Sequence, residues 1–194
     1  MTAHAFASLL EWFPDYCDDD KIELMYRHWQ LMLKWNARTN LTAIRKDSEA
    51  LLKHYADSVV MVNILPPSGS VLDVGSGGGF PGVPLAIVRP DLTWRLLEPR
   101  QKRVSFLKAT VARLGLKNVE VIAARSDETP TSTSDLAVTR ATFSDVDGAR
   151  TVLDWLRPDG ALYALRSLDA EDWPNAETRM LNFGSETRRI DRLS

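Results

Sequence analysis

The first third of the chain carries apolar side chains at the spacing of an α-helix. In 20–35 and again in 48–65 they recur every three or four residues, which places them on one helix face, and Pro66-Pro67 ends the second run. Asp20 with Glu23 three residues later is typical of a capping box in which Asp replaces Ser or Thr. The apolar face of the first run consists of Met25, Trp29, Met32 and Leu33. Two helices are therefore predicted before the chain reaches residue 66.

From residue 67 onward, short apolar runs alternate with helical segments. Strands are predicted at 71–74, 93–98, 119–123, 135–139 and 161–165, and helices at 82–88, 101–114 and 146–156. Gly115 is expected to end the second of these helices, and 157–160, Arg-Pro-Asp-Gly, is expected to form a turn. Near the end of the chain, 179–183 and 186–190 flank Gly184-Ser185, which predicts an antiparallel hairpin.

This alternation predicts an α/β fold, with a mostly parallel, doubly wound sheet and helices on both faces. The final hairpin would add an antiparallel edge to that sheet. The 194 residues suffice for one domain with a sizeable core. We expect one compact unit, in which 1–66 forms an N-terminal helical cap and 67–194 forms the sheet domain.

Composition narrows the class of protein further. Apolar residues make up 44% of the chain and charged residues 26%, and no apolar run approaches the ~20 residues that span a bilayer. The N-terminus lacks the pattern of a secretory signal, and the lone Cys17 cannot build a disulfide framework. We therefore expect a cytoplasmic protein that contacts no membrane. A monomer without a metal is a separate expectation, which these observations do not decide.

The segment 71–82, Val-Leu-Asp-Val-Gly-Ser-Gly-Gly-Gly-Phe-Pro-Gly, is typical of a loop that binds a nucleotide-type cofactor. A buried strand runs into glycines, among them Gly75 and Gly77, which permit a sharp turn where a Cβ would not fit. Asp73 lies two residues before the first glycine. Its carboxylate should therefore lie at the carboxyl end of the strand, where open parallel sheets bind ligands, and it suits a cationic amino group.

Two classes of cofactor compete for this loop. Dinucleotides need a third glycine, which Phe80 replaces here, and Asp73 would repel their pyrophosphate. S-adenosylmethionine carries no phosphate but has an ammonium group and a ribose, and Glu98, after the next predicted strand, suits the ribose hydroxyls. We favour S-adenosylmethionine, while a purely structural tight turn remains the alternative.

Charge is distributed unevenly although the net charge is only −2. Between Arg95 and Arg125, eight basic residues stand against two acidic ones, Glu98 and Glu120. A basic segment beside a cofactor loop is what a phosphate-rich substrate requires, although a solvated helix face explains it equally well.

If the chain is a methyltransferase, the motifs that it lacks limit which kind of atom accepts the methyl group. Methyltransferases that act on exocyclic amines resemble one another in an Asn/Asp-Pro-Pro-aromatic motif after the fourth strand. At that place this chain has Thr-Arg-Ala-Thr-Phe, residues 139–143, so this class is disfavoured. Carbon-5 methylation of pyrimidines needs a cysteine nucleophile, and the only thiol, Cys17, lies far upstream of the loop. A ring nitrogen with its own lone pair, such as guanine N7, needs neither a base nor covalent activation.

Several motifs in order give the chain a resemblance to a known family, between about Leu31 and Leu165. They are Lys34-Trp35-Asn36, Asn40-Leu41-Thr42, His54 with Asp57-Ser58, Asp73-Val74-Gly75, Phe80-Pro81-Gly82, Lys102-Arg103 with Phe106-Leu107, Arg125 and Arg140-Ala141. The chain resembles the bacterial glucose-inhibited division protein B family, the small-subunit (16S) ribosomal RNA guanine-N7 methyltransferases. The resemblance implies a Rossmann-like class I methyltransferase fold, S-adenosylmethionine as methyl donor and ribosomal RNA, free or in the small ribosomal subunit, as substrate.

The resemblance also implies a set of site residues. By this resemblance Gly75, Phe80, Ser126, Asp127 and Arg140 line the cofactor site, to which the loop itself adds Asp73, Gly77 and Glu98. The expected RNA-binding residues are Lys102, Arg103, Arg125 and Arg166. Arg140 is the one candidate for a catalytic role, with an ion pair to Asp145 as the structural alternative. His54 is expected to be a hydrogen-bonded helix histidine. The chain departs from the family at Arg166-Ser167, where the family has Lys-Gly.

Two other functions remain open at this point. A methyltransferase that acts on a protein or a small molecule would have the same cofactor loop, with the basic segment as solvated surface. A module that binds the cofactor or the ribosome without catalysis is the third possibility.

Overall fold

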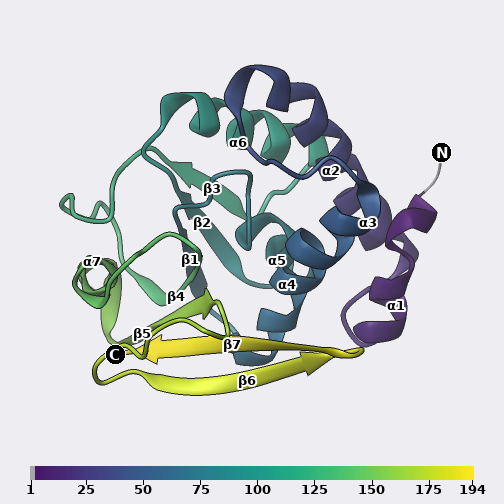
Figure 1. Ribbon diagram of the computed structural model, residues 1–194. Helices are drawn as coiled ribbons and strands as arrows, with labels where there is room; N and C mark the ends of the chain where they lie inside the picture. The colour runs from purple at the N-terminus through teal and green to yellow at the C-terminus, as the bar shows by residue number, and fades with distance from the viewer. Residues whose placement is uncertain (1–2) are drawn as a thin grey trace.

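The computed structural model describes residues 3–194, and a seven-stranded sheet is its central feature (Figure 1). The strands lie in the order β3-β2-β1-β4-β5-β7-β6. Their bounds are β1 Ser70–Val74, β2 Thr93–Leu97, β3 Val119–Ile122, β4 Ser134–Arg140, β5 Leu156–Arg166, β6 Glu177–Phe183 and β7 Glu186–Leu193. The first five pair in parallel, and β7 and β6 pair antiparallel at one edge. The predicted α/β class and the final hairpin are both confirmed.

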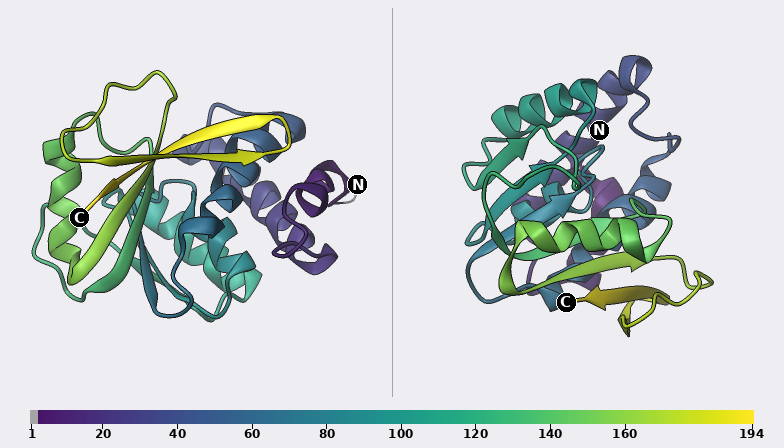
Figure 2. Two further views of the ribbon diagram at one scale, coloured as in Figure 1. Left: turned by 90° about the horizontal axis from the view of Figure 1, so that it is seen from below. Right: turned by 90° about the vertical axis from the view of Figure 1, so that its left-hand side faces the viewer.

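Helices cover the two faces of this sheet unequally (Figure 2, left). One face packs against α2 (Asp19–Thr39), α4 (Asp57–Val59), α5 (Gly82–Val88) and α6 (Gln101–Leu114) in the larger core cluster. The other face packs mainly against α7 (Val146–Arg150) and the 3-10 turn that follows it. Along β1 the side chains alternate between these layers, because Val71 belongs to the first cluster and Leu72 to the second. All five residues of β1 are buried, as a central parallel strand requires.

The N-terminal helices belong to the same core as the sheet. Before α2 lie a 3-10 turn, Ala3–Phe6, and α1, Ser8–Trp12. The predicted second helix is an irregular run, in which α3 (Asp47–Ala50) leads into a π-helical segment, Leu51–Ala56, then α4, then a 3-10 segment, Val60–Ile64. Since one apolar cluster contains residues of these helices and of β1 and β2, the cap shares its core with the sheet. The domain division at residue 66 stays a prediction.

Two local predictions were wrong, each for a physical reason, and one predicted helix is only partly regular. The cap of α2 is Asp18, whose side chain accepts a hydrogen bond from the Lys21 N–H at 2.9 Å, so Asp20 lies inside the helix. Residues 157–160 lie in β5 as an irregular stretch, because Ser134 pairs with Leu156 while Leu136 pairs with Ala161. The predicted helix at 146–156 changes to 3-10 geometry after α7.

One feature of the sheet positions the functional site. The strand order reverses at β1, which has β2 on one side and β4 on the other, and open α/β sheets bind ligands at the carboxyl ends of strands at such a reversal. No helix within residues 3–194 is long and apolar enough to cross a membrane.

The antiparallel edge is held by a buried carboxylate, Asp191 on β7. It accepts hydrogen bonds from Arg166 on β5 at 2.6 Å, from Arg189 at 2.9 Å and 3.0 Å, and from the Thr178 hydroxyl on β6 at 2.8 Å. Burial opposes its ionisation, but these donors outweigh burial and hold the pKa of Asp191 below its ordinary value. One side chain therefore joins three strands.

We predict that Asp191→Ala destabilises the fold by about 3–5 kcal/mol, because it leaves the largely buried Arg166 without its carboxylate and leaves Arg189 only the exposed Asp172. Urea unfolding at pH 7 measures this free energy. Since the folded-state pKa is depressed, the stabilisation is complete above the unfolded value of 3.8 and is lost as pH falls. The difference between the two proteins should therefore shrink below about pH 4. Asp169→Asn, at an exposed position, is the control, and an equal loss there would contradict the assignment.

Candidate cofactor and active site

The glycine-rich turn connects β1 to α5 and has a backbone that only glycine adopts without strain. Gly75, Gly77 and Gly79 have φ angles of 70°, 55° and 91°. A Cβ built on Gly75 would lie 2.5 Å from Cγ2 and 2.6 Å from Oγ1 of Thr142, which follows β4. The turn therefore lies so closely against the end of a neighbouring strand that no side chain fits at Gly75.

Asp73 is wholly buried beneath this turn. Its Oδ2 accepts a hydrogen bond from the Gly82 N–H at 3.0 Å, while Oδ1 has no hydrogen-bond partner in the part of the chain that the structure describes. Burial raises the pKa of Asp73 to about 7. The structure thus gives Asp73 a different position from the one expected, because its carboxylate is enclosed behind the loop at the start of α5 and does not line the cavity.

Glu98, at the end of β2, holds the turn from the other side. Its Oε2 accepts a hydrogen bond from the Gly77 N–H at 2.9 Å, and its Oε1 accepts one from the Arg100 N–H at 2.9 Å. Arg103 on α6 lies 3.8 Å from the same carboxylate. Glu98 is nearly buried but lines the cavity next to Gly77, where it was expected.

Two adjoining cavities open at this end of the sheet. The first, about 410 Å³, is lined by 75–78, Phe80, Glu98, Arg103, Arg140 and His54, among other residues. The second, about 320 Å³, is lined by Ser126 and Asp127, and it shares Gly75, Pro99 and Thr142 with the first. The structure therefore brings the expected cofactor residues together around two adjoining cavities, apart from Asp73, which lies behind the glycine turn.

Arg140 approaches the first cavity from the end of β4. Its guanidinium donates to the Lys53 carbonyl at 2.6 Å and to Nδ1 of His54 at 3.1 Å, and it lies 5.1 Å from the centre of the Phe80 ring. Burial lowers the pKa of Arg140, whereas Asp57 and Asp73 raise it. The alternative ion pair with Asp145 is wrong, because Asp145 instead caps α7 by accepting from the Gly148 N–H at 2.8 Å.

His54 is neutral and fully hydrogen-bonded. Burial, followed by the nearby Arg140, lowers the pKa of His54 to about 3. Its Nδ1 therefore accepts from Arg140, which leaves Nε2–H to donate to the Thr42 hydroxyl at 2.9 Å. The ring also stacks on Phe80, with centroids 4.5 Å apart. As expected, His54 is a hydrogen-bonded helix histidine; it lies in the π-helical segment and orients Arg140.

A second buried histidine holds the glycine turn and was missed from the sequence. His28 on α2 contacts the Gly78 carbonyl through Nε2 at 2.9 Å and the Tyr55 hydroxyl through Nδ1 at 3.0 Å. Burial lowers the pKa of His28 to about 4, so the ring is neutral. Its place on the apolar face beside Met25 and Met32 was the available signal, but that position alone does not reveal its partner in a distant loop.

The four expected RNA-binding cations do not form one surface. Lys102 is exposed on α6, whereas Arg103 faces the cofactor cavity and Glu98. Arg125 pairs with Asp127 at 2.9 Å. The expectation for Arg166 needs correction, because it is largely buried, pairs with Asp191 and lies 4.0 Å from the centre of the Trp173 ring. Its charge therefore stabilises the hairpin edge.

The strand order, the glycine turn after β1 and the acids at the ends of β1 and β2 define a Rossmann-like methyltransferase fold. Solved structures agree: a SAM-dependent methyltransferase from Aquifex aeolicus superimposes with a TM-score of 0.56 at 20% identity, over 74% of this chain and 92% of that one. Coclaurine N-methyltransferase, solved with N-methylheliamine and SAH, gives 0.53 at 16% identity, over 84% and 55%.

The chain belongs to the GidB family, described as rRNA small subunit methyltransferase G, whose model matches residues 21–192. Curated relatives carry the name ribosomal RNA small subunit methyltransferase G. The protein from Chromobacterium violaceum is 35% identical over 86% of this chain and 78% of its own length. The one from Acetivibrio thermocellus is 31% identical over 89% and 74%, and the one from Wolinella succinogenes 40% over 73% and 70%. The resemblance noted in the sequence is thereby confirmed.

We predict that Gly75→Ala lowers the affinity for S-adenosylhomocysteine at least tenfold, as measured by calorimetric titration. The new Cβ would clash with Thr142 and strain the backbone at a φ of 70°. Gly115→Ala is a matched control, because Gly115 has a φ of 69° but nothing within 4 Å of its Cβ position. The control should lose about 1 kcal/mol of stability and no affinity. Equal affinity losses in both variants would show that strain alone is responsible.

We also predict that Asp73 makes the free protein less stable as pH rises. Its folded-state pKa of about 7 exceeds the unfolded 3.8, so the folded state binds more protons between those values, and the free energy of unfolding falls across them. The slope reaches at most about 1.4 kcal/mol per pH unit. In Asp73→Asn the amide oxygen still accepts from Gly82 and this slope disappears.

The measured quantity is the difference in unfolding free energy between wild type and Asp73→Asn at each pH. The buried His28 and His54, with lowered pKa values, produce an opposite trend below their unfolded value of 6.5 in both proteins, and it cancels in the difference. A difference that stays constant from pH 4 to 7 would show that Asp73 remains ionised in the folded state.

Proposed function

We propose that this protein transfers the methyl group of S-adenosylmethionine to N7 of a guanine in small-subunit ribosomal RNA. The observation that carries the proposal is the glycine turn held open between Asp73 and Glu98, in a chain whose family is described as rRNA small subunit methyltransferases. The cytoplasm is the proposed location because this substrate is made there. A monomer is proposed because one chain supplies both adjoining cavities.

The residues present fit S-adenosylmethionine. Gly75 and Gly77 line the first cavity without presenting a side chain, and Glu98 offers carboxylate oxygens at the strand end where a ribose binds in folds of this kind. The buried Asp73 carboxylate, with one oxygen unpartnered, favours a cation in front of the loop, such as the ammonium group of the donor. Ser126 and Asp127 would border the adenine in the second cavity.

When bound, S-adenosylmethionine supplies an electrophilic methyl group on a sulfonium. The chain then needs only to orient the acceptor, because guanine N7 attacks with its own lone pair. The residues at the cavity match this requirement: His54 is neutral with both nitrogens engaged, and Arg140 is a cation, so neither acts as a base at neutral pH. We assign Arg140 to an anionic oxygen, a carboxylate or an RNA phosphate, since its guanidinium is already oriented by Lys53 and His54.

The test is transfer of tritiated methyl groups to deproteinised small-subunit ribosomal RNA from cells that lack the modification. We expect label in the RNA and, after borohydride and aniline treatment, strand scission at the methylated guanine. Gly75→Ala serves as the control with an impaired cofactor site.

Absence of label in RNA while S-adenosylhomocysteine still binds would refute the proposed activity. Label in a protein or a small molecule would favour the alternative substrates. Label in RNA without scission would place the methyl group on another atom.

A further inference from the structure

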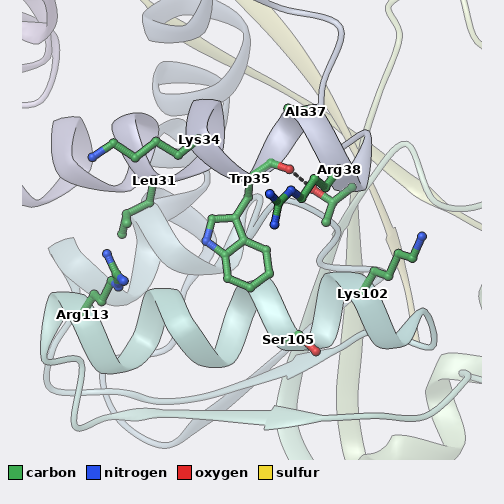
Figure 3. A pocket seen from close by; sticks show the side chains of 9 residues that line it. Leu31, Lys34, Trp35, Ala37, Arg38, Lys102, Ser105 and Arg113 are labelled. Carbon is green, nitrogen blue, oxygen red and sulfur yellow. Dashed lines mark hydrogen bonds between the residues drawn. The ribbon is translucent and has the colours of Figure 1, made fainter.

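A groove between α2 and α6 lies outside the cofactor site and is larger than either cofactor cavity. Its volume is about 830 Å³, twice that of the cavity beside the glycine turn. Figure 3 shows Trp35 directed from α2 toward α6, with Arg113 to one side and Lys102 to the other. The two cations lie in the first and last turns of α6, about 16 Å apart along the helix.

The groove carries only positive charge. Its lining includes Lys34 and Arg38 from α2 and Lys102 and Arg113 from α6, and it contains no carboxylate. None of these four side chains forms an ion pair or a side-chain hydrogen bond with any residue between 3 and 194. The other residues expected to bind RNA, Arg103, Arg125 and Arg166, differ, because each faces an acidic partner. Four unpaired cations in one groove favour a polyanion.

Trp35 gives the groove a flat aromatic surface. Its side chain is half-buried, and its ring is held edge-to-face against the buried Phe106, with centroids 5.8 Å apart and an interplanar angle of 64°. The indole is therefore fixed in position while part of it remains accessible. Proteins that bind single-stranded nucleic acids present an aromatic ring among cations. Bases stack on the ring while phosphates contact the cations.

The groove leads to the cofactor cavity along two segments of the chain. Thr39 lines the groove and Leu41 lines the cavity, while on α6 Lys102 lines the groove and Arg103 lines the cavity. A strand lying in the groove would thus continue toward the glycine turn and Arg140.

We propose that the α2–α6 groove binds a single-stranded segment of the RNA substrate next to the target guanine, with a base stacked on Trp35 and phosphates on the four cations. This proposal rests on the proposed function and adds a docking site to it. The groove increases the affinity for the RNA and positions the RNA relative to the cofactor cavity. It takes no part in methyl transfer.

The test compares wild type with the triple variant Lys34→Gln/Arg38→Gln/Arg113→Gln. Because these side chains have no partners in the fold, we expect unchanged thermal stability, S-adenosylhomocysteine affinity and kcat. The KM for deproteinised ribosomal RNA should rise tenfold or more. The slope of log affinity against log salt concentration should fall by about 2, since each single-strand phosphate contact contributes about 0.7. Lys108→Gln, an exposed cation on α6 outside the groove, is the control and should match wild type.

The stacking of a base on Trp35 is tested by separate variants. Trp35→Leu, which keeps apolar packing against Phe106, should weaken RNA binding about tenfold, and Trp35→Phe should restore most of the loss. If the wild type is active and the triple variant has an unchanged KM and salt slope, the proposal that the groove binds RNA is refuted and the proposed function is not affected. If the variant is impaired only with assembled small ribosomal subunits and not with deproteinised RNA, the groove binds a ribosomal protein, and the proposal of RNA binding is refuted as well. If the wild type binds RNA through the groove but transfers no methyl group, the proposed function is refuted and the proposed RNA-binding role of the groove is supported.

Discussion

Two carboxylates at the ends of neighbouring strands hold the backbone N–H groups of the glycine turn, and the site depends on this arrangement. Asp73 binds the Gly82 N–H from beneath, and Glu98 binds the Gly77 N–H from the side. Both acids are almost wholly out of water, where such hydrogen bonds are strong and an unpartnered charge is costly. The fold thus fixes the turn before any ligand arrives.

The N-terminal helices form the second half of the site. His28 reaches the Gly78 carbonyl from α2, and His54 orients Arg140 from the π-helical segment. The Phe80 ring lies between them, with centroids 5.1 Å from His28 and 4.5 Å from His54. A π-helical segment at this point agrees with the tendency of such segments to occur at functional sites. The cap therefore shapes the cofactor turn directly, and a sheet without it would lack the anchors of both Gly78 and Arg140.

Local sequence signals predicted what depends on local sequence. The buried strands, the glycine turn, Glu98 at a strand end and the hairpin at Gly184-Ser185 all follow from periodicity and backbone preference. The sequence could not show that Asp73 would be enclosed, because its exposure depends on how α5 closes over β1. Nor could it show that Arg166 pairs with Asp191, since the register of β5 against β7 brings them together. Pairings between distant segments are set by packing.

The same reasoning explains why net charge was a poor guide to the RNA surface. A net charge of −2 does not oppose a polyanion, because at physiological salt an exposed charge is screened beyond about 8 Å and only the local arrangement matters. Near the cofactor site Arg103 and Arg125 each lie against a carboxylate, which fixes geometry but cancels charge. The groove has the opposite arrangement, because two helices distant in sequence contribute cations to one surface and no acid. Attraction for a phosphate backbone therefore depends on which cations the fold leaves unpaired.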